Sequence, residues 1–236
     1  MSLSLPRRVE HEILDGLSAD DPCAQRSRVD LRRIHRAMAT VSIVHRALDR
    51  CPTGFRPQSL VELGAGDGTL MLRLAKRRAA EWPGLQATLL DRLTLVEPST
   101  LAGLRGLGWM PRVVVRDAFD WAASTGSHQT DVVLANLFMH HFPSPDLARL
   151  LTGIAARARV FFCCEPRRSA LPLAGSHLIG LLGAGAVTRK DAVSSVHAGF
   201  RARELSELWP DPRGWELHEY PAGLFSHCFL AIRKER

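Results

Sequence analysis

Apolar residues along the chain fall into two alternating kinds of segment. Short apolar runs typical of buried strands begin at residue 59 and cover residues 86–90, 112–116, 130–136 and 159–164. Between them lie segments of helical composition, at residues 68–81, 98–107 and 144–157. Because neighbouring parallel strands must be joined by long crossovers, this alternation predicts a doubly wound α/β fold with a mostly parallel sheet.

The two ends of the chain depart from this rhythm. Near the C-terminus, strand-like residues 215–221 and 226–234 have a short connection containing Gly223, which predicts an antiparallel hairpin. Near the N-terminus, apolar residues at helical spacing predict one amphipathic helix over residues 30–48, with Asp30 as its N-cap.

No repeat or linker divides the chain, so we expect one domain with additions. A helical N-terminal cap is expected over residues 1–50 and the main domain over residues 51–236. A substrate lid is expected within residues 166–213, where residues 171–187 are apolar and rich in glycine and a helix is expected around residues 203–209. This apolar stretch is shorter than the about 20 residues that a membrane-spanning helix needs, so no transmembrane segment is expected.

Charge and cysteine content exclude several classes of protein. The 31 Lys and Arg residues exceed the 24 Asp and Glu residues, but they are spread along the whole chain and mark no nucleic-acid footprint. Five cysteines without a CxxC pair predict neither a disulfide scaffold nor a metal site. Charged residues interrupt the N-terminal segment before a signal-peptide core can form, so we expect a cytoplasmic protein.

A glycine-rich segment follows the first strand-like run and opens a helix. It reads Glu62-Leu63-Gly64-Ala65-Gly66-Asp67-Gly68. Glycine permits positive φ and a close backbone approach to a ligand, and a helix N-terminus offers unpaired N–H groups. Thr69 occupies the position of the third glycine in a dinucleotide fingerprint, and a phosphate-loop lysine is missing. The segment therefore predicts a cofactor-binding turn that is neither a dinucleotide fingerprint nor a phosphate loop.

This segment belongs to a wider pattern of motifs. VELGAGDGT (61–69), Asp91, RDAFDW (116–121), DVVLANLFMHHF (131–142) and the terminal hairpin together resemble the class I S-adenosylmethionine-dependent methyltransferases. The resemblance runs from about residue 59 to the C-terminus and is greatest with small-molecule members of the ubiquinone and menaquinone biosynthesis group. It implies a seven-stranded, Rossmann-like methyltransferase fold, S-adenosylmethionine as cofactor and methyl transfer as activity.

The resemblance also implies which residues hold the cofactor. Gly64, Gly66 and Gly68 would pass under the methionyl part and the ribose, while Glu62 would lie near the methionine end. Asp117 would bind the adenine amino group. The other implied contacts are Ala65 in the glycine turn, Ala118 and Phe119 at the adenine edge, and Asn136 and Leu137 below the reactive methyl group.

Two acidic residues compete for the ribose hydroxyls. Asp91 ends the run over residues 86–90, and Glu97 follows another apolar run over residues 93–96. We prefer Asp91, because the Trp82-Pro83-Gly84 stop leaves residues 86–90 as the shortest strand. If residues 93–96 form the strand instead, Glu97 takes the role.

Histidines are the candidates for a general base. His140 and His141 follow the fourth strand at its carboxyl end, where open α/β sheets bind ligands, and imidazole can take a phenol or acid proton near neutrality. The alternative is that this pair only packs and caps the turn. His177 and His197 in the insertion are further candidates, and Glu165 after the fifth strand is expected at the ligand edge.

The segment after the fourth strand also bears on the methyl acceptor. Asn136-Leu137-Phe138-Met139 lacks the prolines that accompany methylation of nucleobase amines in this family, which disfavours a nucleic-acid partner. We expect a small apolar, aromatic or lipid-like acceptor, methylated on oxygen in preference to carbon or nitrogen. An RNA-binding or RNA-modifying methyltransferase-like protein is the alternative, and Thr69 disfavours an NAD-dependent oxidoreductase. The sequence leaves open whether the chain forms a homodimer.

Overall fold

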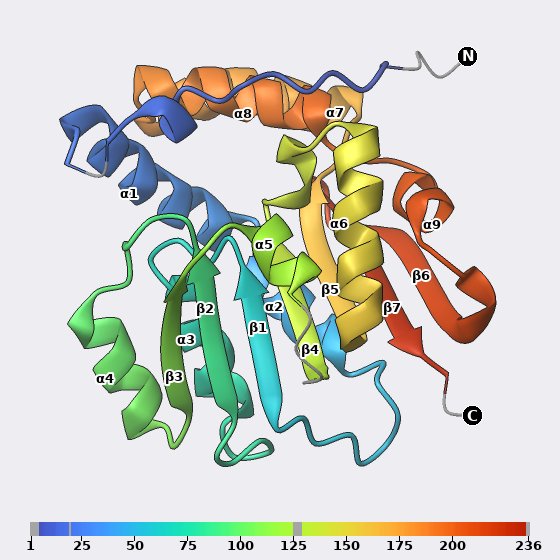
Figure 1. The fold of residues 1–236 in the computed structure, drawn as a ribbon. Coiled ribbons are helices and arrows are strands. Elements are labelled where there is room, and N and C mark those ends of the chain that lie inside the picture. Colours follow the sequence, from blue (N-terminus) through green and yellow to red (C-terminus); the bar gives the residue numbers. More distant parts are fainter. Residues whose placement is uncertain (1–4, 19, 125–128, 235–236) are drawn as a thin grey trace.

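The computed structural model describes residues 5–18, 20–124 and 129–234, which contain a seven-stranded sheet (Figure 1). The strands are β1 (Ser59–Leu63), β2 (Gln86–Asp91), β3 (Met110–Val115), β4 (Thr130–Asn136), β5 (Ala158–Pro166), β6 (Trp215–Ala222) and β7 (Ser226–Arg233). Their order is β3-β2-β1-β4-β5-β7-β6; β1 to β5 are parallel, and β7 runs antiparallel to both β5 and β6. The predicted doubly wound sheet with a C-terminal hairpin is confirmed.

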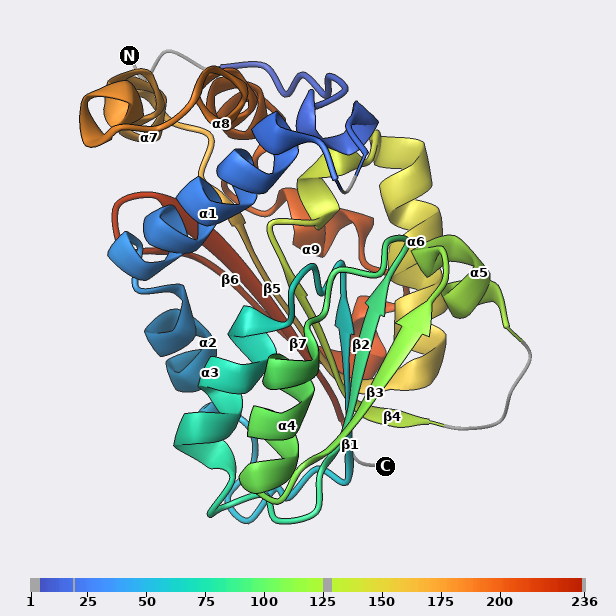
Figure 2. The same ribbon diagram turned by 90° about the vertical axis from the view of Figure 1, so that its left-hand side faces the viewer.

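Helices cover both faces of this sheet (Figure 2). On one face lie α2 (Thr40–Leu48), α3 (Thr69–Arg78) and α4 (Pro98–Gly106); on the other lie α5 (Ala118–Ala123), α6 (Ser144–Arg157) and α9 (Glu204–Leu208), which is followed by a one-turn helix, η4 (Pro212–Gly214). Side chains alternate between the faces of a strand, so Leu89 of β2 joins the core under α3 and Leu90 joins the core under α6. Burial on both faces explains why the strands read as continuous apolar runs.

A third group of segments lies over the carboxyl ends of the parallel strands (Figure 1). It contains α1 (Pro22–Ala37), α7 (Ala170–Leu178), η3 (Ile179–Leu182), α8 (Ala186–Ala198) and an N-terminal strap, residues 5–17, which includes the short helix η1 (Leu14–Gly16). Asp30 of α1 accepts a hydrogen bond from the Gly185 N–H at 2.8 Å, which ties α1 to the start of α8. These segments roof the edge of the sheet at which ligands bind in open α/β folds.

The N-terminal helices differ from the single helix expected over residues 30–48. Helix α1 starts earlier, at Pro22, where the Asp21 carboxylate caps it, and the chain breaks at Ala39 with φ +54° before α2 begins. Asp30, the expected N-cap, is instead buried within α1. The apolar spacing continues across the break, so periodicity alone does not reveal it.

The apolar insertion forms a broken helical hairpin. Residues 171–187 belong to α7, η3 and the first turn of α8, with a left-handed turn at Gly183. No helix in the described ranges combines the length and apolar character required to cross a membrane.

Candidate active site

A cavity of about 1460 Å³ lies between the carboxyl ends of the sheet and the segments that roof it. Its floor is formed by the loops after β1, β2, β3 and β4, and its roof by α1, the strap, α7 and α8. Pockets that hold one drug-sized ligand usually measure about 300–1,000 Å³. This cavity therefore has room for two ligands side by side.

The glycine turn after β1 makes part of the floor. Gly64, Gly66 and Gly68 have φ values of +68°, +54° and +72°, a region that side chains other than glycine rarely adopt. A Cβ on Gly64 would lie 2.4 Å from the Phe138 ring, whereas one on Gly66 would meet no atom within 4 Å. Gly66 therefore faces open cavity, as expected of a residue beneath a ligand.

Gly68 departs from its expected role. It does not line the cavity, and a Cβ there would lie 2.5 Å from the Leu89 side chain. Its left-handed conformation starts α3 and lets that helix pack closely on β2. In this structure Gly68 serves helix packing, and its expected place under the cofactor stays a prediction.

Asp91 closes the glycine turn. It ends β2, lines the cavity, and accepts hydrogen bonds from the Gly66 N–H at 2.9 Å and the Leu93 N–H at 3.0 Å. Each carboxylate oxygen keeps acceptor capacity for a second donor. Glu97 is exposed, its carboxylate accepts a hydrogen bond from the Ser99 hydroxyl, and it lies outside the cavity lining. The geometry thus favours Asp91 over Glu97.

The expected adenine side is present in part. Asp117 and Ala118 line the cavity after β3, and the Asp117 carboxylate accepts the Phe119 N–H at 2.7 Å, which caps α5. The Phe119 ring points elsewhere, since it packs edge-on against Phe142 at 5.2 Å beneath the Arg149 guanidinium. The Phe119 ring therefore packs between α5 and α6, and its expected contact with the adenine edge stays a prediction.

Three polar atoms on the cavity wall are buried without a hydrogen-bond partner. They are Glu62 Oε2, Asn136 Oδ1 and His35 Nε2. Burial, with the nearby charges of Asp67 and Asp91, raises the pKa of Glu62 well above its usual value, and burial lowers the pKa of His35 to about 4. Because unsatisfied buried groups are costly, such atoms indicate a ligand that supplies the missing partners.

Strained backbone follows β4. Leu137 lines the cavity with φ +51°, and its N–H donates to the Cys164 carbonyl at 2.9 Å. A left-handed conformation costs a residue with a Cβ about 1–2 kcal/mol. The turn brings Phe138 over Gly64 and leads into the one-turn helix η2 (Met139–His141).

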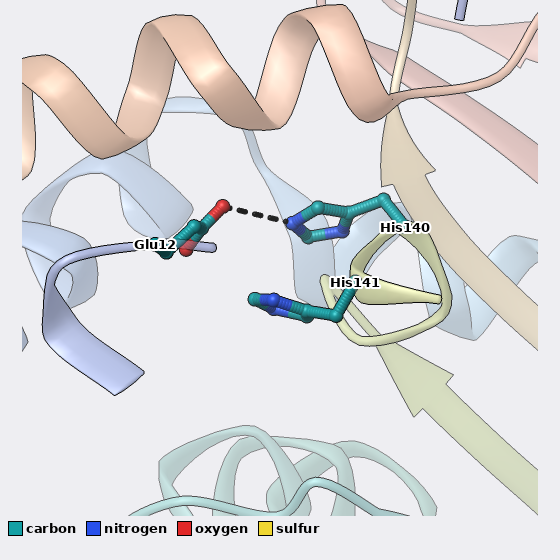
Figure 3. Close-up of side chains that lie close together, drawn as sticks. All are labelled: Glu12, His140 and His141. Atoms are coloured by element: carbon teal, nitrogen blue, oxygen red, sulfur yellow. Dashed lines mark hydrogen bonds and ion pairs between the residues drawn. The ribbon is translucent and has the colours of Figure 1, made fainter. Parts of the chain in front are cut away.

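His140 lies between two carboxylates, those of Glu165 and Glu12, and Figure 3 shows its contact with Glu12. Its side chain is only 3% exposed; Nδ1 lies 2.7 Å from Glu165 Oε2, and Nε2 lies 3.3 Å from Glu12 Oε1. Burial by itself would lower the pKa of His140, but hydrogen bonds to Glu12 and Glu165, together with their charges, raise it to about 9. Such a pKa keeps the ring protonated at neutral pH, with both nitrogens directed at carboxylates, an arrangement that does not favour the expected role of His140 as a general base.

His141 has a different environment. Its ring lies 4.2 Å from that of His140, lines the cavity and is 21% exposed. Nδ1 lies 3.2 Å from Asp15 Oδ2 of η1. His141 therefore stays the candidate base of the pair.

The remaining candidates do not reach the cavity. Glu165 is fully buried and accepts the Phe138, Met139 and His140 N–H groups, so it shapes η2 and does not emerge at the ligand edge. His177 and His197 lie outside the cavity lining. The expectation that any of these three side chains meets the acceptor is not supported by their positions.

A cluster of possible metal ligands lies at the same place. Glu12, His140 and His141 each offer a ligand atom, and these atoms lie within 4.8 Å of one another (Figure 3). Nitrogen and carboxylate oxygen suit several divalent cations. The sequence predicts no metal site, since residues 12 and 140 give no recognisable ligand spacing.

Several cavity residues carry no sequence pattern that could have identified them. Glu12 and Asp15 precede the first long helix in a segment without periodicity, and His35 lies on the polar side of an amphipathic pattern. Arg32 of α1 also lines the cavity and pairs with Asp67 of the glycine turn at 3.0 Å.

No protein-family model matches the sequence, and no curated protein matches it. Solved structures do match in fold. The plantazolicin methyltransferase BpumL in complex with SAH has a TM-score of 0.63 at 13% identity, covering 91% of this chain and 92% of that one. Magnesium protoporphyrin IX methyltransferase (ChlM) from Synechocystis PCC 6803 with bound SAH has a TM-score of 0.54 at 16% identity, covering 94% and 91%.

A third similar structure is longer than this chain. An O-methyltransferase family protein from Burkholderia thailandensis has a TM-score of 0.59 at 15% identity, covering 92% of this chain and 61% of that one. Identities this low establish the fold alone. The chain thus has the Rossmann-like fold of these methyltransferases, as the motifs predict.

Proposed function

We propose that the protein is an S-adenosylmethionine-dependent methyltransferase acting on a small apolar or aromatic acceptor, with oxygen as the favoured methyl-accepting atom. The observation that carries this proposal is the glycine turn closed by the Gly66–Asp91 hydrogen bond beneath a large cavity. The similar structures with bound SAH, the demethylated cofactor, support it.

The residues present suit this cofactor. The Asp91 carboxylate can still accept hydrogen bonds from a ribose diol, and the Asp117 carboxylate can accept one from an adenine amino group. Unpaired Glu62 Oε2 and Asn136 Oδ1 can accept hydrogen bonds near the methionyl end. When bound, S-adenosylmethionine supplies a sulfonium-activated methyl group, so that the protein contributes mainly alignment and a desolvated site.

The rest of the cavity suits an apolar acceptor. Its walls include Leu14 and Leu17 of the strap, Leu178 and Ile179 of the insertion, and Phe225 of the β6–β7 turn. We propose that the cap over residues 1–50 and the lid within residues 166–213 enclose this acceptor. Oxygen is favoured because His141 can take a hydroxyl proton, whereas a carbon or a neutral amine makes less use of such a base.

The alternative of an RNA-directed protein receives less support. Several described arginines are paired with carboxylates of the same chain: Arg78 pairs with Asp49 and Glu81, and Arg149 pairs with Asp146. A roofed, mainly apolar cavity suits a small molecule better than a polynucleotide backbone. We therefore propose neither a nucleic-acid partner nor a dinucleotide cofactor.

Calorimetry with SAH tests the proposal. The wild-type protein should bind SAH, and Asp91→Ala should weaken binding about 100-fold, because two charge-assisted hydrogen bonds to the ribose are lost. Glu97→Ala is the matched control and should bind like wild type.

Binding of NADH in place of SAH, or equal SAH affinity in the two variants, would contradict the proposal. Once SAH binding is established, incubation of the protein with S-adenosylmethionine and a panel of phenols, quinols and fatty-acid-derived hydroxy compounds identifies the acceptor class. The readout is accumulation of SAH.

A further inference from the structure

The strap carries a carboxylate to the histidine that faces the cavity. Asp15 lies in η1, 126 positions before His141 in the numbering, and its Oδ2 is 3.2 Å from His141 Nδ1. Both side chains are partly exposed, 35% for Asp15 and 21% for His141, so this pair is accessible from the cavity, unlike His140 at 3%.

The strap that presents Asp15 is anchored at two places, both of which precede Asp15 in the chain. Asp191 of α8 accepts the Ile13 and Leu14 N–H groups at 2.8 and 2.9 Å, directly before Asp15. Nearer the N-terminus, the Arg7 guanidinium donates to the Ala198 and Phe142 carbonyls at 2.8 and 3.0 Å. Asp15 is thus held in place by the contacts of the residues that precede it.

The histidine is fixed from its other side. His140 packs 4.2 Å from the His141 ring and is itself held by Glu165 and Glu12, so it can rotate little. The charged groups around His141 are therefore Asp15 and Glu12 of the strap and the His140 imidazolium of η2; Arg92 lies near Asp15. His141 is the member of this cluster with a ring nitrogen outside the carboxylate contacts.

We propose that Asp15 is a positioning residue for the methyl-transfer reaction: it holds neutral His141 in the tautomer with hydrogen on Nδ1, which leaves the Nε2 lone pair for the acceptor. This inference rests on the proposed function. A carboxylate on one imidazole nitrogen fixes the tautomer and orientation of the ring in the same way in hydrolase triads.

The proton balance is simple. The acceptor O–H bond breaks, its proton goes to His141 Nε2, and the oxygen electron pair forms the bond to the methyl carbon. The resulting imidazolium keeps its Nδ1–H bonded to Asp15, whose negative charge stabilises it. The C–S bonding pair returns to sulfur, so no further reactant is needed.

The tautomer can be measured without any acceptor. In protein labelled with ¹⁵N-histidine, long-range proton–nitrogen correlation spectra identify which ring nitrogen carries hydrogen, and His141→Gln assigns the signal. Neutral His141 should be the Nδ1–H form in the wild type and should shift toward the Nε2–H form in Asp15→Asn, since an amide can donate to Nδ1. Asp20→Asn, an exposed aspartate in the same region, is the control.

Kinetics with the acceptor found by the panel gives the second test. Asp15→Asn should lower kcat about 10²- to 10⁴-fold, with SAH affinity unchanged. His141→Gln should lower kcat by a similar factor. The double variant should have a kcat no lower than either single variant, because the two residues act as a unit. A wild-type tautomer with hydrogen on Nε2, or an Asp15→Asn variant with normal kcat, overturns the inference.

The readouts separate the two levels of proposal. Absence of SAH binding refutes the methyltransferase assignment. If the protein binds SAH and turns over, but Asp15→Asn has the same kcat as the wild type, only the positioning role is refuted. Loss of turnover on treatment with EDTA and its return with Zn²⁺ or Mg²⁺ would also overturn the inference, since Glu12, His140 and His141 would then act as metal ligands.

Discussion

At the residue scale, Gly66 and Gly84 are two of several glycines with a positive φ and open space at the Cβ position, and comparing them separates backbone strain from ligand contact. Both have positive φ, +54° and +71°, and a Cβ on either would meet no atom within 4 Å. Gly66 faces the cavity, whereas Gly84 lies in an exposed turn before β2.

Alanine at either position should lower the free energy of unfolding by about 1–2 kcal/mol, the cost of a side chain in the left-handed region. Only Gly66→Ala should also weaken SAH binding, by about 10- to 100-fold, because its methyl group enters the space beneath the ligand. Urea denaturation and calorimetry on both variants measure the two effects. Equal SAH affinity in the two variants would show that Gly66 does not underlie the cofactor.

Single residues also show where sequence reasoning reaches its limit. Asp91 and the cavity-facing Gly66 are predictable, because a turn after a buried strand has few ways to bind a ligand. Phe119 is not, since its side-chain direction depends on Phe142 and Arg149, which come from later in the chain. The residue type at a position determines which chemical groups are available. Packing with distant residues decides whether the side chain points toward the site.

At the scale of elements, the ion pair between Glu12 and His140 joins the strap to η2 and is expected to stabilise its docking. Burial alone would raise the pKa of Glu12, but the hydrogen bond and charge of His140 lower it, while the pKa of His140 rises to about 9. A raised histidine pKa contributes stability that is complete below the unfolded value of 6.5 and is lost as pH rises through about 9.

Protection of strap amides against hydrogen exchange, corrected for intrinsic rates, should therefore fall between pH 7 and pH 9.5. Glu12→Gln should remove about 2 kcal/mol of docking free energy at pH 7, roughly a 30-fold faster opening, and its difference from wild type should shrink as pH rises. Glu10→Gln, an exposed carboxylate two residues earlier, is the control. Equal protection in wild type and Glu12→Gln at pH 7 would mean that the backbone contacts alone hold the strap.

At the scale of the whole molecule, ligand binding and stability are linked. A ligand that binds only the folded state stabilises it by about 2.7 kcal/mol at 100 times its Kd, which raises Tm by roughly 5–10 °C for a domain of this size. SAH should produce such a shift and NADH should not, as thermal denaturation can measure. A shift with NADH alone would identify the glycine turn as a dinucleotide site.

The division between sequence and tertiary structure follows from the range of the interactions. The sequence by itself determined the alternating strands and helices, the terminal hairpin and the glycine turn, because periodicity and turn chemistry are local, whereas the structure favoured Asp91 over Glu97 beside that turn. Only the tertiary structure decided that Glu12 and Asp15 meet His140 and His141, more than 120 residues away. Such contacts depend on how the strap crosses the sheet, and no local pattern encodes that path.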